Sequence, residues 1–427
     1  MKHAMFRRPT DLKQTDLPTQ HRQPGADWTA IETLIALCNS GRLYEVEQWI
    51  AEGHPIQCAP PSDRKLRRRH TPLQIAVSKG FHSLAAVLLA NGYNPNGDYC
   101  GCLEIAVRSR DRDMVELLLK FGADPNACDI EEVLLTYDRP IMDRFIEAGV
   151  DPCAGNATAR ALLGKARPML GFVKTHWERI PGLRHQVETA LHVFARENDE
   201  KGVALMLWLG ANPYAITPAT ASPEDVNELS HCAMESALWC SRISIRRQLM
   251  RKPIPADMVR PLMRAVACNP CPDVVRFLLA AGADPNTTED EDGSTVLEHF
   301  VTSIAWRFGN HEPNQDALEL EALELMLAAG AKMHPPQRRL AQLRRSLLDG
   351  YPAKIRKAIE LLGRYEAMSA SELHELTRTP TMRRLLSGQS KTGSKTSVDL
   401  MADNHSSKIS AQASGPGGYW KNRWYLR

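Results

Sequence analysis

A short glycine-containing segment recurs along this 427-residue chain, each time directly after an apolar run with helical spacing. A glycine just past a helix end takes the left-handed backbone that closes the last turn, and Asp-Pro or Asn-Pro is typical of turns. The spacing predicts a repeat of about 30 residues, with some members enlarged or lacking the motif. The copies read NGYNPN, FGADPN, AGVDPC, LGANPY, AGADPN and AGAKMH, with glycines at Gly92, Gly122, Gly149, Gly210, Gly282 and Gly330.

Each repeat contains two helical segments. One begins at Thr71-Pro72, with Thr71 as N-cap and Pro72 at the first helical position. The other follows Asp113 and places Val115 and Leu118 on one face. Two antiparallel helices and a turn cannot bury their apolar faces alone, so the repeats are expected to stack.

These motifs resemble those of the ankyrin-repeat family. Residues Thr71 to Ala76 (TPLQIA) resemble that family's T-P-L-H-x-A helix start, and Thr189 to His192 do so more loosely. Gly122 to Asn126 and Gly282 to Asn286 match its G-A-D-P-N ending. The resemblance implies an all-α solenoid of stacked antiparallel helix pairs with short β-turn fingers. At about 33 residues per repeat, residues 28–366 hold about ten repeats.

The segments outside this array differ from it in composition. Residues 1–27 are polar and contain prolines, which predicts a disordered or loosely docked arm. Residues 367–386 predict a short basic helical extension, and residues 387–427 a flexible low-complexity tail. The tail ends in a segment that we interpret as a docking motif, because it combines aromatic and basic residues: Tyr419, Trp420, Arg423, Trp424 and Tyr425.

Charge is distributed in patches. The chain has 53 Lys and Arg against 50 Asp and Glu, which excludes a surface evenly covered in phosphate-binding charge. Residues 337–386 hold eleven basic against five acidic residues, whereas Glu289 and Asp290 begin an acidic finger. Charge that alternates in sign along the chain favours docking of a partner in one orientation. An enlarged finger near the start is basic, through Arg64, Lys65, Arg67, Arg68 and Arg69.

The sequence offers no motif for catalysis. The patterns G-x-S-x-G, H-E-x-x-H and G-x-G-x-x-G are absent from it. Cys268 and Cys271 have the spacing of a metal-binding pair, and His231-Cys232 would complete a site only if the fold brought the two segments together. A helix end is the simpler interpretation. We therefore predict a non-enzymatic protein with no catalytic residue, no cofactor and no metal site.

Location and assembly can only be predicted in outline. The first residues, MKHAMFRRPTDLKQ, lack the apolar core of a secretion signal. The longest apolar runs cover only about one third of a membrane span. Ten cysteines spread over helical stretches fit free thiols in a reducing compartment. We expect a cytoplasmic monomer or weak oligomer, with delivery into another cell or the nucleus as alternatives.

The family resemblance implies a scaffold that binds another protein on its concave face and finger tips, and the sequence does not name that protein. Tyr214 is expected to be accessible, whereas Trp208 is expected in the core. The alternative function is nucleic-acid association, through the basic finger 64–69, the basic C-terminal cap and the aromatic tail. The predicted partner contacts are Asn96, Asp98, Tyr99, Asn126, Asp129, Tyr214, Ile216, Asn286, Glu289, Asp290 and Trp306.

Overall fold

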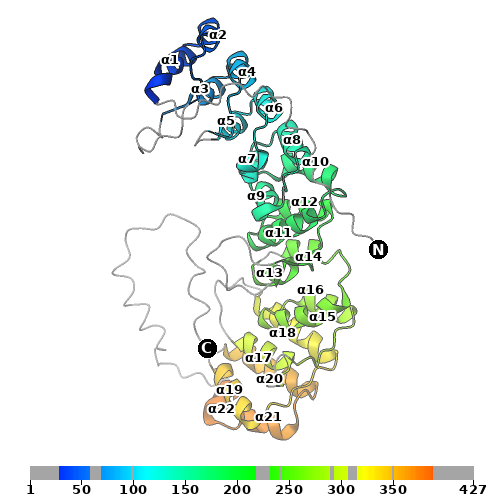
Figure 1. The fold of residues 1–427 in the computed structure, drawn as a ribbon. Helices are drawn as coiled ribbons and strands as arrows, with labels where there is room; N and C mark the ends of the chain where they lie inside the picture. Colours follow the sequence, from blue (N-terminus) through cyan, green and yellow to red (C-terminus); the bar gives the residue numbers. More distant parts are fainter. Residues whose placement is uncertain are drawn as a thin grey trace, which may run out of the picture. The chain divides into compact units, whose positions relative to one another are not determined.

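The described secondary structure is almost entirely helical, as the sequence predicts (Figure 1). The chain divides into two compact units, of which unit 1 ends at Ala265 and unit 2 begins at Val266. The predicted N-terminal arm and the tail after Ser387 lie outside the described residues. The computed structural model describes residues 28–57, 69–97, 101–217, 231–240, 243–288, 293–305, 315–348 and 351–387.

Unit 1 begins with a 3₁₀ turn, η1 (Trp28–Ile31), and continues as a series of helix pairs. Two further 3₁₀ turns, η3 (Pro125–Ala127) and η4 (Ala154–Asn156), lie in its fingers. Strand β1 (Ile216–Thr217) pairs antiparallel with β2 (His231–Cys232). The helices are α1 (Glu32–Ser40), α2 (Leu43–Ala51), α3 (Pro72–Ser78), α4 (His82–Ala90), α5 (Cys102–Arg108), α6 (Arg112–Lys120), α7 (Ile130–Leu135), α8 (Arg139–Glu147), α9 (Ala157–Gly164), α10 (Ala166–His176), α11 (Gly182–Arg196), α12 (Glu200–Leu209), α13 (Ala233–Cys240), α14 (Ile243–Leu249) and α15 (Ala256–Cys268), within which the division falls.

Unit 2 continues the helical pattern. An isolated bridge between Thr288 and Thr295 precedes its second helix. Across the described residues of both units, every helix is too short or too polar to cross a membrane. The helices of unit 2 are α16 (Pro272–Ala280), α17 (Val296–Ala305), α18 (Gln315–Ala328), α19 (Gln337–Leu348), α20 (Pro352–Arg364), α21 (Ala370–Thr377) and α22 (Pro380–Ser387).

The helices pack in two rows within each unit. In unit 1 the first helices of successive pairs pack neighbour on neighbour from α1 to α13, and the second helices do so from α2 to α8 and from α10 to α14. In unit 2 the rows are α17, α19, α21 and α16, α18, α20, α22. The predicted fold class, an all-α stack of helix pairs, is confirmed. Helices α21 and α22 cover the predicted basic extension at 367–386 and extend the two rows, with α21 against α19 and α22 against α20.

Each helix contributes an apolar stripe to the space between the rows. In α6 the predicted core residues Val115 and Leu118 are 2% and 0% exposed, together with Met114 at 0%. In α8 the largest such side chain is Phe145, which is also fully buried. Burying one such side chain contributes about 1.5–3 kcal/mol. The stack therefore supplies the burial that a single helix pair cannot.

Residues with left-handed backbone fix the length of the second helix. In five pairs, one residue with positive φ precedes the second helix and another follows it, twelve positions later. Such a backbone costs an L side chain about 1–2 kcal/mol, and glycine avoids that cost. The geometry is thus kept even where the first of the two residues is not glycine. The five combinations are Gly41 with Gly53, Gly80 with Gly92, Arg110 with Gly122, Tyr137 with Gly149, and Asn198 with Gly210.

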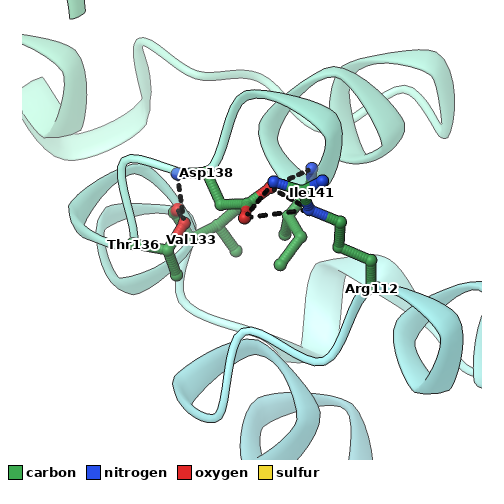
Figure 2. A network of polar contacts seen from close by, with 5 residues as sticks. All are labelled: Arg112, Val133, Thr136, Asp138 and Ile141. Atoms are coloured by element: carbon green, nitrogen blue, oxygen red, sulfur yellow. Dashed lines mark hydrogen bonds and ion pairs between the residues drawn. The ribbon is translucent and has the colours of Figure 1, made fainter. Parts of the chain in front are cut away.

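Polar contacts join consecutive second helices at their N-termini. Asp138 is the N-cap of α8, and its amide donates to Thr136 Oγ1 at 3.1 Å (Figure 2). Arg112, the first residue of α6, donates to both carboxylate oxygens of Asp138 at 2.9–3.0 Å. His82 of α4 lies 2.9 Å from Asp111, the N-cap of α6, in the same way. Each aspartate therefore caps its own helix and also holds the preceding one.

We predict opposite effects of substitution at the two left-handed positions of the third pair. Arg110→Gly should raise the free energy of unfolding by about 1 kcal/mol, because it removes the cost of a side chain at φ 56°. Gly122→Ala should lower it by about 1 kcal/mol. Nothing lies within 4 Å of a Cβ placed on Gly122, so only the backbone cost at φ 85° remains. Urea denaturation measures both changes.

Arg110→Ala is the control, since it shortens the exposed side chain and keeps the Cβ. It should leave the free energy of unfolding close to that of the natural chain. A gain for Arg110→Ala equal to that of Arg110→Gly would contradict the backbone explanation.

Candidate functional site

Two predicted finger contacts, Asn96 and Asn286, bond to the turn of the following helix pair. Asn96 Nδ2 donates to the carbonyl of Gly122 at 2.8 Å, and its Oδ1 accepts from the amide of Asp124 at 2.8 Å. Asn286 makes the same two bonds with the turn after α18, at 3.3 and 2.8 Å. We call this arrangement the amide bridge. Both side chains are exposed, yet their polar atoms already hold the array together.

Asn126 and Asp129 are also engaged locally. The amide of Asn126 donates to Asp124 Oδ1 at 2.9 Å, which forms an Asx turn. Asp129 is the N-cap of α7 and accepts from the amide of Glu131 at 2.9 Å. Both residues are exposed. Their contact with a partner stays a prediction.

Tyr214 is buried, and the prediction that its side chain is accessible is wrong. It is 2% exposed, and its hydroxyl donates to the carbonyl of Lys252 at 3.0 Å. Burial raises the pKa of Tyr214. The residue occupies the position that Asn96 and Asn286 occupy in their fingers. A phenol is longer than an amide side chain and reaches the more distant turn after α14.

Several predicted residues lie outside the described part of the chain. Arg69, the last residue of the basic finger, is described and pairs with Glu32 at 3.2 Å. The others are Arg64, Lys65, Arg67, Arg68, Asp98, Tyr99, Glu289, Asp290, Trp306, Tyr419, Trp420, Arg423, Trp424 and Tyr425.

Ile216 is accessible. It lies on β1 opposite Cys232, and its side chain is 59% exposed although that of Cys232 is fully buried. The short β1–β2 pairing holds the backbone of this finger in place. An apolar side chain of this size on a paired strand can contact another molecule without first being ordered.

Trp208 is exposed, which corrects the expectation that it belongs to the core. Helix α12 buries Val203 and Met206, and Trp208 points from the opposite face with 61% of its surface accessible. The run GVALMLWL is apolar all round, so its pattern contains no period that could assign a buried face. The residue was therefore missed as a candidate contact.

Trp208 is part of a cluster of aromatic and basic side chains. Lys174 Nζ of α10 lies 4.9 Å from the centre of the Trp208 ring. The Arg184 guanidinium lies 5.7 Å from the centre of the Trp177 ring, and that ring adjoins the turn at Gly210. Each such cation–ring contact contributes about 0.5–1 kcal/mol at an exposed site. We call these four side chains, together with the exposed Ile216 that follows the same turn along the chain, the α12-turn patch. The four are Lys174, Trp177, Arg184 and Trp208.

Contacts of a buried histidine fix helix α10, which carries Lys174 and is followed by Trp177. His176, at the end of α10, is 7% exposed, and its Nε2 lies 2.8 Å from Asp143 Oδ1 of α8. Arg139 donates to the same carboxylate at 2.6 and 2.7 Å. Burial alone would raise the pKa of Asp143, but these hydrogen bonds outweigh it, and the pKa lies below the ordinary aspartate value.

The row of first helices presents charges that are already paired. Arg108 of α5 donates to Glu132 of α7 at 2.6 and 2.8 Å. Arg160 of α9 lies 2.7 Å from Glu131 of α7. Exposed ion pairs of this kind contribute about 1 kcal/mol or less. This face therefore offers polar complementarity, whereas the α12-turn patch offers apolar area.

His, Cys, Asp and Glu side chains, the types that serve metal binding and catalysis, are distributed over the described residues. No group of three or more His, Cys, Asp or Glu side chains there is close enough to hold a metal ion. Burial raises the pKa of the Cys38 and Cys128 thiols to about 12, so both stay protonated at neutral pH. A protonated, buried thiol is a poor nucleophile.

The family assignment follows from the repeats. A family model described as "Ankyrin repeats (3 copies)" matches residues 34–129, and one described as "Ankyrin repeat" matches residues 260–290. These two stretches of the chain are ankyrin repeats. The matched stretches contain α1 to α6 and most of α15 with α16. The remaining ankyrin-like helix pairs follow the same two-row packing with weaker sequence motifs.

Known proteins resemble parts of this chain. Dynein axonemal heavy chain 12 of Bos taurus is 39% identical over 69 residues, which are 15% of this chain and 19% of that protein's length. The human ASB11 ankyrin repeat domain is 17% identical, with 71% of this chain and 98% of that one covered and a TM-score of 0.26. The ankyrin repeat domain of Bcl-3, a member of the IkappaB family, is 18% identical, with 62% and 91% covered and a TM-score of 0.27.

Tyr214 is predicted to stabilise unit 1. Tyr214→Phe removes the bond to Lys252 and should lower the free energy of unfolding by about 1 kcal/mol. Tyr214→Ala also removes buried ring area and should cost about 3 kcal/mol or more. Tyr44→Ala is the matched control, because Tyr44 is 78% exposed, and it should change stability by less than about 0.5 kcal/mol. Thermal unfolding followed by circular dichroism ranks the three variants, and Tyr214→Ala as stable as Tyr44→Ala would contradict the prediction.

Asp143 is predicted to make stability depend on acid pH. A carboxylate whose pKa is lower in the folded chain stabilises that chain above the ordinary aspartate pKa of about 3.9, and the effect is lost as pH falls through the folded value. Asp143→Asn should therefore lower the unfolding free energy by about 1 kcal/mol at pH 7. Urea titrations between neutral and acid pH should show this difference shrinking as pH falls, and a difference independent of pH would be evidence against the ion pair.

Proposed function

We propose that this ankyrin-repeat protein binds another protein through the α12-turn patch. Ankyrin repeats are in general modules for protein–protein interaction. The observation that carries the proposal is the 61% exposure of Trp208 in a helix whose other apolar face is packed. Tryptophan and arginine are the residues that most often anchor protein interfaces, and both occur in this patch.

The patch is ordered before any partner arrives. Lys174 lies over the Trp208 ring, and Ile216 stands on a paired strand. Between them along the chain, the buried Tyr214 fixes the turn through its bond to Lys252. Preorganised side chains lose little conformational entropy on binding, so a few anchors are enough for useful affinity.

Other surfaces have less support as the main site. The side-chain polar atoms of the predicted finger contacts Asn96 and Asn286 already bond within the amide bridge. Arg69, the described member of the basic finger, is paired with Glu32. Nothing among the described residues of unit 1 favours nucleic acid over protein. The oligomeric state and the cytoplasmic location stay predictions.

The proposal is tested by affinity capture with the full-length chain. Proteins retained from a lysate by the natural chain at high salt should be lost with Trp208→Ala, and reduced with Ile216→Ala. Truncation of an anchor tryptophan costs at least about 2 kcal/mol, which is a roughly 30-fold loss of affinity. Mass spectrometry identifies the retained proteins, and titration with the purified partner gives the affinity.

Tyr44→Ala is the control for removal of an exposed aromatic side chain from the same unit. Its capture should equal that of the natural chain, and all variants should keep their circular dichroism spectrum. Equal capture by Trp208→Ala and the natural chain would contradict the proposal that the α12-turn patch binds the partner.

A further inference from the structure

Unit 2 carries basic side chains at the loops that join the helices of its last two pairs. The end of α19 and the start of α20 are separated by only residues 349–351, and the end of α21 and the start of α22 by residues 378–379. Arg344 connects the two loops, because it lies near the end of α19 and donates to the carbonyls of Glu375 and Leu376 at the end of α21. The two loops therefore lie on one edge of the unit.

Five exposed cations follow this edge, and we call them the cationic edge. None of their side chains makes a hydrogen bond or ion pair with another described residue. The nearby carboxylate of Glu375 is already shared by Arg344 at 3.5 Å and Arg378 at 3.1 Å. Asp349 is an acidic residue of the first loop and lies outside the described residues. The five residues are Arg345, Arg356, Lys357, Arg383 and Arg384.

Apolar side chains adjoin these cations on α22. Met382 is fully buried and anchors the helix against α19 and α20. Leu385 and Leu386 are only half-buried, directly after Arg383 and Arg384 in the chain. Helix α22 is the last described helix, and no later described helix covers its other side. Unneutralised cations beside half-covered leucines form a surface that is complementary to an acidic segment with apolar side chains.

We propose that the cationic edge binds an acidic, amphipathic segment of another protein. Carboxylates of that segment pair with Arg356, Lys357, Arg383 and Arg384, and its apolar side chains cover Leu385 and Leu386. Nucleic acid is the less suitable occupant. The aromatic side chains among the described residues of 337–387 are Tyr351 and Tyr365, which are both half-buried, and the Tyr365 hydroxyl donates to Glu324 at 3.3 Å. Neither offers a fully open ring on which bases could stack, and phosphates would leave the leucines uncovered.

The test is fluorescence anisotropy with the full-length chain and a short labelled peptide of Glu, Asp and Leu. A peptide of the same length with Gln and Asn in place of the acids is the neutral probe. The natural chain should bind the acidic peptide and bind the neutral one about tenfold more weakly or worse. The combined variant R356Q, K357Q, R383Q, R384Q should lose affinity for the acidic peptide by about the same factor.

Arg276→Gln with Arg364→Gln is the matched control, because these cations of unit 2 are 52% and 57% exposed but already paired with glutamates. It should bind the acidic peptide as the natural chain does. Trp208→Ala should also bind normally, so the result is independent of the α12-turn patch. Equal binding of the two peptides, equal binding by the combined variant, or binding of a short DNA duplex in place of the acidic peptide would each overturn the proposal.

Discussion

Backbone groups in several of the described turns are bonded by a side chain of the preceding helix pair, and these bonds set the register between neighbouring pairs. Gln57 Oε1 accepts from the amide of Asn94 at 3.0 Å, and Asn96 and Asn286 accept from later turns in the same way. A turn whose backbone groups lost these partners would lose about 1 kcal/mol per bond. Two kinds of contact therefore hold neighbouring helix pairs together. Apolar side chains are buried between the rows, and hydrogen bonds at the fingers set the register.

The sequence was sufficient to predict the fold because the signals that define it are local. Gly122 and the nearby Asp124-Pro125-Asn126 predict a helix end from local sequence alone, independently of tertiary contacts. The motif-bearing helix pair α5 and α6 ends at Gly122 in this way, whereas α9 and α10 form without the full signature and follow helical spacing alone.

The candidate site was predicted only in part, because exposure depends on contacts between helix pairs. The hydroxyl of Tyr214 bonds to a turn 38 residues later in the chain, so the burial of this side chain cannot be predicted from the residues next to it in the sequence. Trp208 lies in a helix that is apolar on every side, so only the packing of α10 and α12 decides which face is free. Ile216, by contrast, follows a turn and belongs to a short strand, and its exposure agrees with its predicted place on a finger.

Bonds between fingers join residues at very different separations along the chain. Asn96 bonds to a residue 26 positions later, Tyr214 to one 38 positions later and Asn286 to one 44 positions later. The cost of closing a longer loop grows only slowly with its length, so an insertion between bonded turns weakens the stack little. The array can therefore acquire long loops, and with them new recognition sequences, while the helix pairs beneath keep their places.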